Sequence, residues 1–210
     1  MYSSSSFRSD RPEEVESFIR NHPFAHIIGY DGVYPVATQV PVLFTSVGGI
    51  KKLTGHFKRN TSHHEAMAAN PNVLVIFNGP HAYISASVYQ QPSMASTWNY
   101  QAVQVKGTIR YLNEEETLNH LGLITDFYED NILSAASFRH LDNDYLLKSV
   151  KAIQGFEILI ETIDHIFKLS QNHSPENQRN IISELEAREE LLAAQVAAMM
   201  KENICRKCNE

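Results

Sequence analysis

A loop rich in hydrogen-bond donors is the first place in the chain where chemistry is expected. The run Leu53–Ser62 reads LTGHFKRNTS, in which a predicted strand ends and a predicted helix begins at Ser62. Exposed N–H groups at that helix N-terminus, together with Lys58, Arg59 and the Thr61 hydroxyl, predict a phosphate cradle. An ordinary polar connection between a strand and a helix is the alternative that spacing alone leaves open.

Aromatic and amide side chains surround the only tryptophan of the chain. Trp98 stands beside Asn99 in the segment Thr97–Tyr100, and the segment Asn78–Ser85 adds further amide and aromatic groups. Aromatic faces with amide hydrogen-bonding groups suit a flat heteroaromatic ligand. The alternative is that Trp98 fills the core, which is the more common fate of a lone tryptophan.

A third polar cluster, Phe167–Asn172, follows the last predicted strand directly. Lys168 and Gln171 in this segment either reach a ligand or satisfy the backbone of a loop. Composition does not decide between these two interpretations.

Histidines and cysteines raise the question of a metal. His56, His63 and His64 suggest a metal or haem site, but adjacent histidines diverge on a helix and no Cys or carboxylate accompanies them at ligand spacing. No metal site is therefore predicted. Cys205 and Cys208 resemble half a zinc site or a redox pair, yet the chain holds no second pair. We expect an exposed dithiol without a dedicated function, and a zinc ion shared between two subunits is the alternative.

Charge and hydropathy limit the classes of partner. The 210 residues include 18 basic and 24 acidic side chains, for a formal net charge of −6. This balance argues against direct DNA binding, because phosphate contacts by basic side chains supply most of such affinity. The first ten residues are polar, and no apolar run is long enough to span a membrane. A cytoplasmic protein without a membrane partner is expected.

Hydrophobic periodicity predicts an α+β, mainly β fold. Paired hairpins, the first turning at Asp31-Gly32, favour an antiparallel barrel over a doubly wound sheet. The expected helices are one that begins near Pro12 and stops before Pro23, then Ser62–Ala69, Glu114–Tyr128 capped by Asn113 with Glu116, and Asn143–Ile153. The expected strands are Phe24–Tyr30, Tyr34–Phe44, Ile50–His56, Val73–Phe77, Ala102–Leu112 and Phe156–Ile163.

The C-terminal tail differs in character from the rest of the chain. A single long helix is predicted from Ser174 to about Lys201, because Leu185, Leu192 and Met199 recur every seven residues. Such a stripe packs either on its own barrel or on a partner. We expect a barrel domain at residues 1–173 and a helical extension at 174–210.

The three polar segments, taken together, resemble the PaiB family of FMN-binding negative transcriptional regulators. The resemblance also includes Pro35–Pro41 and Lys151–Ile158, and the blocks match in order and spacing from Met1 to about Arg179. It implies the FMN-binding split β-barrel shared with pyridoxamine phosphate oxidases, here with peripheral helices and a long C-terminal helix. It also implies a homodimer with flavin sites shared between subunits.

The resemblance places the cofactor on particular residues. The second strand is expected along the isoalloxazine edge, and the loop after the third strand is expected to hold the phosphate. The partner subunit is expected to complete the site. The residues so assigned are Ala37, Thr38, Gln39 and Val40 for the edge, His56, Arg59 and Thr61 for the phosphate, and Trp98, Asn99, Lys168 and Gln171 from the partner.

One departure from the family pattern affects the phosphate loop. The family tends to have Ala-Arg-Ala-Asn-Pro followed by Trp, whereas this chain has Lys58-Arg59-Asn60-Thr61-Ser62 followed by His64. Arg59 keeps the charge, while the other contacts of the loop differ.

Three functions follow from the resemblance. The first is an FMN-binding regulator, for which a DNA partner rests on the resemblance alone. The second is an FMN-dependent oxidoreductase or oxidase acting on a small molecule, in which FMN does the redox chemistry. The third is a haem-handling protein with the same barrel.

Overall fold

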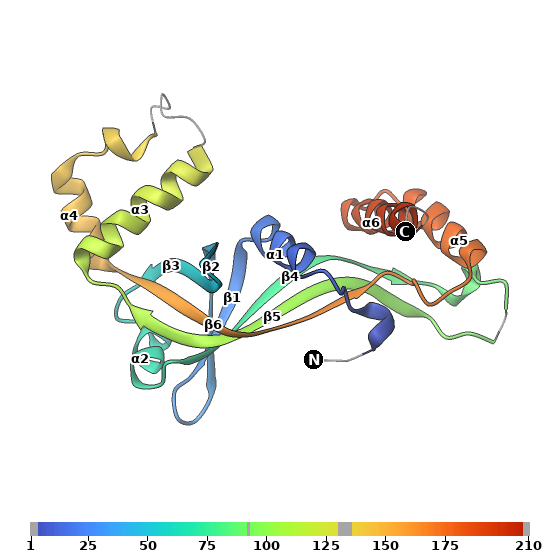
Figure 1. Cartoon of the computed structure of the whole chain (residues 1–210), viewed down its shortest axis with the longest axis horizontal. Coiled ribbons are helices and arrows are strands. Elements are labelled where there is room, and N and C mark those ends of the chain that lie inside the picture. The colour runs from blue at the N-terminus through green and yellow to red at the C-terminus, as the bar shows by residue number, and fades with distance from the viewer. Residues whose placement is uncertain (1–3, 92, 130–135, 208–210) are drawn as a thin grey trace. The chain divides into compact units, whose positions relative to one another are not determined.

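The computed structural model describes residues 4–91, 93–129 and 136–207, which form six strands and six α-helices (Figure 1). The strands are β1 (Phe24–Tyr30), β2 (Pro35–Val47), β3 (Ile50–Lys58), β4 (Asn72–Ile84), β5 (Thr97–Tyr111) and β6 (Ile153–Lys168). The α-helices are α1 (Pro12–Asn21), α2 (Ser62–Ala69), α3 (Glu114–Glu129), α4 (Asn143–Ala152), α5 (Pro175–Glu186) and α6 (Leu191–Lys207). Short 3₁₀ turns are η1 (Ser5–Phe7), η2 (Ala86–Val88) and η3 (Phe138–His140).

The strands form a closed barrel in the order β1-β2-β3-β6-β5-β4, which β1 closes by pairing with β4. The pairs β1–β2, β1–β4, β2–β3 and β3–β6 are antiparallel, so the predicted antiparallel barrel is confirmed. The first hairpin turns where Asp31-Gly32 predicted, with Gly32 at a φ of 99° that glycine adopts readily. The Asp31 carboxylate accepts hydrogen bonds from the amides of Val33 and Tyr34, which fixes this turn.

The strands β4, β5 and β6 extend furthest beyond the ends that the sequence pattern predicted. The pattern Asn78-Gly79-Pro80 was expected to end the fourth strand, but β4 continues to Ile84. β4 pairs with β1 over Leu74–Ile76, so Pro80 lies beyond the stretch where a missing N–H would cost a bond to β1. β5 likewise begins at Thr97 rather than Ala102, and β6 ends at Lys168 rather than Ile163. Residues assigned to loops from the sequence therefore lie on strands.

The chain folds as two compact units, each built from separate stretches of sequence. The barrel unit contains residues 16–77 and 104–163, and the hairpin unit contains residues 1–15, 78–103 and 164–210. β4, β5 and β6 contribute residues to both units. The boundary expected at residue 173 stays a prediction.

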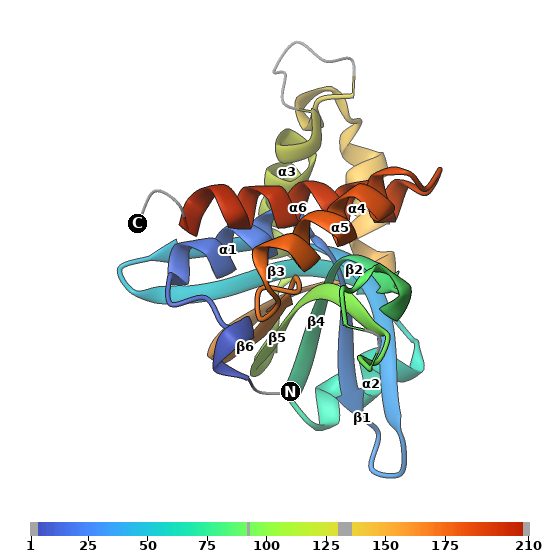
Figure 2. The same ribbon diagram turned by 90° about the vertical axis from the view of Figure 1, so that its right-hand side faces the viewer.

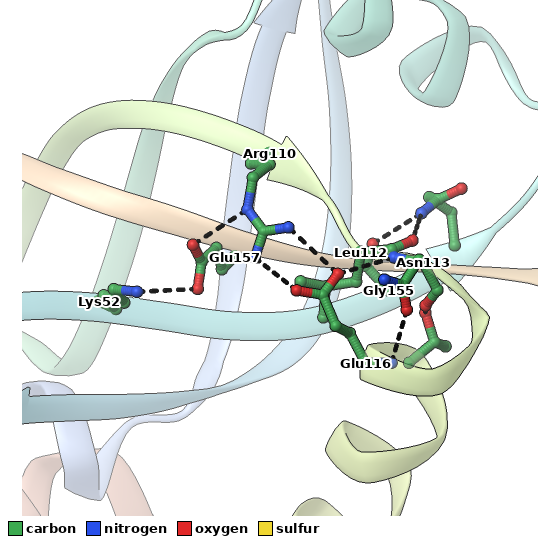
Figure 3. Close-up of polar contacts among 9 residues, drawn as sticks. Lys52, Arg110, Leu112, Asn113, Glu116, Gly155 and Glu157 are labelled. Atoms are coloured by element: carbon green, nitrogen blue, oxygen red, sulfur yellow. Dashed lines mark hydrogen bonds and ion pairs between the residues drawn. The ribbon is translucent and has the colours of Figure 1, made fainter.

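A capping box fixes helix α3 in the barrel unit (Figure 3). Asn113 accepts a hydrogen bond from the Glu116 amide at 2.9 Å, and the Glu116 carboxylate accepts one from the Asn113 amide at 2.9 Å, as predicted. Arg110 of β5 binds Glu116 through both terminal nitrogens and donates from Nε to Glu157 of β6. Glu157 also accepts from Lys52 of β3 at 3.1 Å. This network ties the first turn of α3 to three strands.

The C-terminal tail is two helices rather than the one predicted. Residues 187–190 separate α5 from α6, and the two helices lie side by side in both views (Figure 1, Figure 2). Folding back buries the apolar faces of both helices in one core, whereas a single helix would have left them apart. Leu192, the central residue of the predicted seven-residue stripe, is 42% exposed, so the prediction that it packs in an apolar face was wrong. The core of the hairpin unit contains Ala82, Ile84, Tyr89, Leu169, Ile181, Ile182, Leu185, Ala193, Val196, Ala197 and Met200.

Two further predictions concern membrane-spanning helices and the cysteines near the C-terminus. Across the part of the chain that the structure describes, no helix combines the length and apolarity needed to span a membrane. Cys205 is an exposed free cysteine on α6, and Cys208 lies outside the described residues.

Candidate functional site

The loop between β3 and α2 presents a helix N-terminus with fixed geometry. The helix at Ser62–Ala69 is confirmed, and Thr61 is its N-cap, accepting the His64 amide at 3.4 Å and donating to the Lys58 carbonyl at 3.2 Å. Asn60 adopts a φ of 58°, the left-handed region that asparagine tolerates. The amides of Ser62 and His63 begin the helix, where backbone donors lack intrahelical acceptors. This arrangement suits an anion.

Arg59 is held in place beside this helix N-terminus. Its Nε donates to the Ile153 carbonyl at 2.6 Å, and its backbone amide donates to the Ala152 carbonyl at 3.0 Å. Among the described residues, no hydrogen bond engages its two terminal nitrogens. Burial and then the Arg59 charge lower the pKa of His64. Arg59 is therefore a cation held in position, and its two terminal nitrogens have the geometry that binds phosphate oxygens.

His56 is engaged by a second histidine. Its Nδ1 lies 3.3 Å from Nε2 of His120 on α3, and burial lowers the pKa of His56. Burial, followed by the charge of His56, lowers the pKa of His120 to about 4. The His56 ring thus faces α3, and its expected contact with a phosphate remains a prediction. Within residues 4–91, 93–129 and 136–207, no three His, Cys, Asp or Glu side chains gather as a metal site.

Strand β2 changes its pairing partner part of the way along its length. β2 pairs with β1 over residues 35–41 and with β3 over residues 42–47. In the described structure, residues 35–41 therefore have one backbone edge without a strand partner. The pairing of β3 with β2 ends at Gly55, whereas the pairing of β3 with β6 continues beyond it, as in His56↔Gly155. The sequence did not reveal this unpaired edge, because strand periodicity carries no information on which neighbour each residue pairs with.

The residues expected along the flavin edge lie on that open segment of β2. Ala37 and Gln39 are exposed, Thr38 is half-buried and Val40 is buried, which is the alternation of a strand with one wet face. The side chains of Ala37 and Gln39 reach solvent, while Val40 offers only its backbone. Peptide N–H and C=O groups on an open edge suit the amide groups along one side of an isoalloxazine ring.

Trp98 lies on the surface of the hairpin unit and not in the core. Its side chain is 52% exposed, and its ring lies 6.0 Å from His81 and 5.8 Å from Tyr83 between centroids. The core-filling alternative is thus wrong. Trp98 lines a cavity of about 360 Å³, together with Asn78, Gly79, His81, Tyr100 and Gln101.

The amides of Asn99 and Gln171 are engaged within their own unit. Asn99 is 0% exposed, accepts from the Ser170 hydroxyl at 3.0 Å and donates to the Met200 sulfur at 3.4 Å. Gln171 accepts from the Leu169 amide and donates to the Phe167 carbonyl, both at 2.6 Å. Gln171 thus takes the loop-satisfying role that the sequence had left open, and Asn99 supports the same turn through Ser170. A contact of either side chain with a flavin stays a prediction.

Lys168 lies on the opposite side of β5 from Trp98. Its ammonium group donates to the Thr97 hydroxyl, and Thr97 and Trp98 are successive strand residues, whose side chains point to opposite faces. Thr97 and Lys168 line a second cavity, which does not include Trp98. The four residues expected from the partner subunit therefore do not share one surface. The sequence could not show this, because β5 was expected to begin after Trp98.

Comparisons with known proteins agree with the barrel and the resemblance. Residues 1–162 match the family described as "Putative FMN-binding domain". The chain is 32% identical over 204 residues to "Protease synthase and sporulation protein PAI 2" of Bacillus subtilis, which covers 97% of this chain and 98% of that protein.

Two solved structures share the fold. The FAD and heme binding protein of Mycobacterium smegmatis has a TM-score of 0.56 at 17% identity, covering 76% of this chain and 72% of that one. The flavocytochrome Anf3 of Azotobacter vinelandii has a TM-score of 0.54 at 14% identity, covering 76% and 68%. At these identities the likeness concerns the fold alone. The match to the family model and to PAI 2 shows that the chain belongs to the PaiB family of FMN-binding domain proteins.

Proposed function

We propose that this protein is an FMN-binding homodimer with a regulatory role, in which two subunits share each flavin site. The observation that carries the proposal is the open edge of β2 beside the Arg59–Thr61 loop. Both lie in the barrel unit, so one barrel offers partners for a flat ring with amide groups and for a phosphate.

The phosphate of FMN is assigned to the loop between β3 and α2. Arg59 supplies the charge, and the amides at the start of α2 supply neutral donors aligned with the helix dipole. Thr61 holds the helix start in shape as its N-cap. A dianionic phosphate is favoured here because the cation is already fixed and loses little freedom on binding.

The isoalloxazine ring is assigned to residues 37–40 of β2. Its pyrimidine edge carries N–H and C=O groups that match a backbone edge without a strand partner. The small Ala37 side chain leaves room for a ring, and the exposed Gln39 amide adds a hydrogen-bonding group. These residues bind and orient the cofactor, and bound FMN supplies the redox chemistry.

The partner subunit is assigned the aromatic part of the site. Trp98 is 52% exposed and lies beside the rings of His81 and Tyr83. Such an exposed aromatic group is unusual for a tryptophan that contacts no ligand or partner. We assign Trp98 of the partner subunit to the flavin ring. This assignment makes the dimer part of the site.

The regulatory role is extended from the relative. The relative is named "Protease synthase and sporulation protein PAI 2", and it matches this chain over nearly its whole length. The net charge of −6 gives no general electrostatic attraction to DNA, so regulation through an FMN-dependent contact with another partner fits the composition better.

The absorbance spectrum of freshly purified protein tests the proposal. We expect flavin bands and the release of FMN, rather than FAD, in an amount near one per chain. Failure to bind added FMN would contradict the proposal, and a Soret band would favour the haem alternative. Reduced nicotinamide should be oxidised no faster than by free FMN, whereas steady turnover would favour the oxidoreductase alternative.

A further inference from the structure

We propose that the hairpin unit holds a second binding site, centred on Lys168, for a compact oxyanion such as inorganic phosphate. The site is a cavity of about 270 Å³ on the side of β5 opposite Trp98. This volume is below the roughly 300–1,000 Å³ of pockets for drug-sized ligands, so it fits a small anion and not a flavin nucleotide.

The lining of the cavity has the composition of an anion site. Lys168 and His173 are the basic groups, and no Asp or Glu is among the described residues that line it. The hydroxyls of Ser6 and Thr97 and the Asn172 amide add neutral donors. Oxyanions are bound by this mixture of a cation and several donors.

Lys168 lacks the partner that a half-buried ammonium group normally has. Its described contacts are the Thr97 hydroxyl and the ring of Phe7, whose centroid lies 5.8 Å from Nζ. Among the described residues it forms no ion pair, and burial lowers its pKa. Burial and the charge of Lys168 also lower the pKa of His173. A bound anion would stabilise both charged forms, because it would compensate the lost hydration.

The walls of the cavity are organised in advance of any ligand. Tyr89 and His173 stack with their ring centroids 4.8 Å apart. Ser170 adopts a φ of 59°, and its hydroxyl donates to the buried Asn99 side chain. The buried Tyr89 hydroxyl in this wall has no hydrogen-bond partner among the described residues. A preformed site loses little ordering entropy on binding.

The site uses residues different from those assigned to the flavin. The FMN phosphate is assigned to Arg59 in the barrel unit, and the ring platform is assigned to Trp98 on the other face of β5. The two proposals therefore fail independently. Loss of the Lys168 site leaves the flavin assignment intact, and the reverse also holds.

Calorimetric titration of the full-length, FMN-saturated protein with inorganic phosphate tests the site. We expect one phosphate per chain in the wild type, and at least a tenfold loss of affinity in Lys168→Met with FMN affinity unchanged. Lys201→Met is the matched control, because Lys201 belongs to the same unit and pairs with Glu186 at the surface. Lys168→Arg should restore much of the binding, which a purely structural role for the methylene chain would not explain.

Three outcomes would overturn the proposal. The first is no phosphate binding by wild type at 10-millimolar levels, and the second is equal binding by wild type and Lys168→Met. The third is a parallel loss of FMN affinity in Lys168→Met, which would place Lys168 in the flavin site. If the protein takes up no FMN, the same titration is made without it, and the expected phosphate binding is unchanged.

Discussion

Arg59 is fixed by the carbonyl of Ile153 before any ligand binds, so its loss should be felt specifically by a phosphate. Arg59→Ala should weaken FMN by about ten- to a hundredfold, since a charged hydrogen bond contributes ~1.5–3 kcal/mol. Riboflavin, which lacks the phosphate, should bind nearly as before. Fluorescence titration with both flavins measures this. Lys51→Ala is the control, because Lys51 lies at the other end of β3 and pairs with Glu16. Equal losses for the two flavins would exclude Arg59 from the phosphate site.

Trp98 should show the opposite pattern. Its exposed indole is assigned to the ring system, which FMN and riboflavin share. Trp98→Ala should therefore weaken both flavins by a similar factor, about tenfold for an aromatic contact of ~1.5 kcal/mol. Tyr30→Ala is a control, because Tyr30 is also an exposed aromatic residue but belongs to the first hairpin. Unchanged riboflavin binding in Trp98→Ala would remove Trp98 from the ring site.

His120 should make stability depend on pH. It is 3% exposed, it faces His56, and its pKa of about 4 lies below the ordinary value of 6.5. Because the folded pKa is lowered, the unfolded chain binds more protons between these values. The contribution is fully present above pH 6.5 and is lost as the pH falls towards 4, by up to about 3 kcal/mol.

Urea unfolding of the wild type and of His120→Gln across that pH range measures this contribution. The free energy of unfolding should fall less steeply in the variant, and the difference between the two curves should close as the pH approaches 4. Parallel curves would mean that His120 does not titrate differently in the folded and unfolded chains.

At the scale of elements, the sequence predicted correctly those features that depend only on neighbouring residues. Helix α2 and the capping box of Asn113 and Glu116 follow from neighbouring residues, and both match the sequence prediction. The ends of β4 and β6 depend instead on which strand lies alongside, so the Asn78-Gly79-Pro80 pattern was misleading. The helical hairpin was missed because a seven-residue repeat does not show that the chain folds back at residues 187–190.

The hairpin of α5 and α6 predicts unequal costs for two leucines of the same repeat. Leu185 is 0% exposed in the hairpin core, whereas Leu192 is 42% exposed. Leu185→Ala should lower the free energy of unfolding by about 2–5 kcal/mol, the usual cost of a buried leucine truncation. Leu192→Ala should change it by less than about 1 kcal/mol. Urea unfolding of both variants measures these two costs. Equal losses in the free energy of unfolding would favour one long helix with a continuous apolar stripe over the helical hairpin.

At the scale of the whole molecule, the sequence identified the candidate binding segments but not the faces of the strands on which their side chains lie. The loop at Arg59 and the strand at residues 37–40 were identified, and both belong to the barrel unit, where residues 35–41 of β2 pair with β1 alone. Trp98 and Lys168 were expected together, yet they lie on opposite faces of β5. The face of each side chain depends on where a strand begins, and β5 begins at Thr97, five residues before the predicted start.

The central claim is that two subunits build each flavin site. Sedimentation velocity of the FMN-loaded protein at micromolar concentration, followed at both protein and flavin wavelengths, tests it most directly. The account predicts one species at twice the chain mass of 23.8 kDa, with flavin in a ratio of one per chain. A species of 23.8 kDa that carries stoichiometric FMN would contradict it.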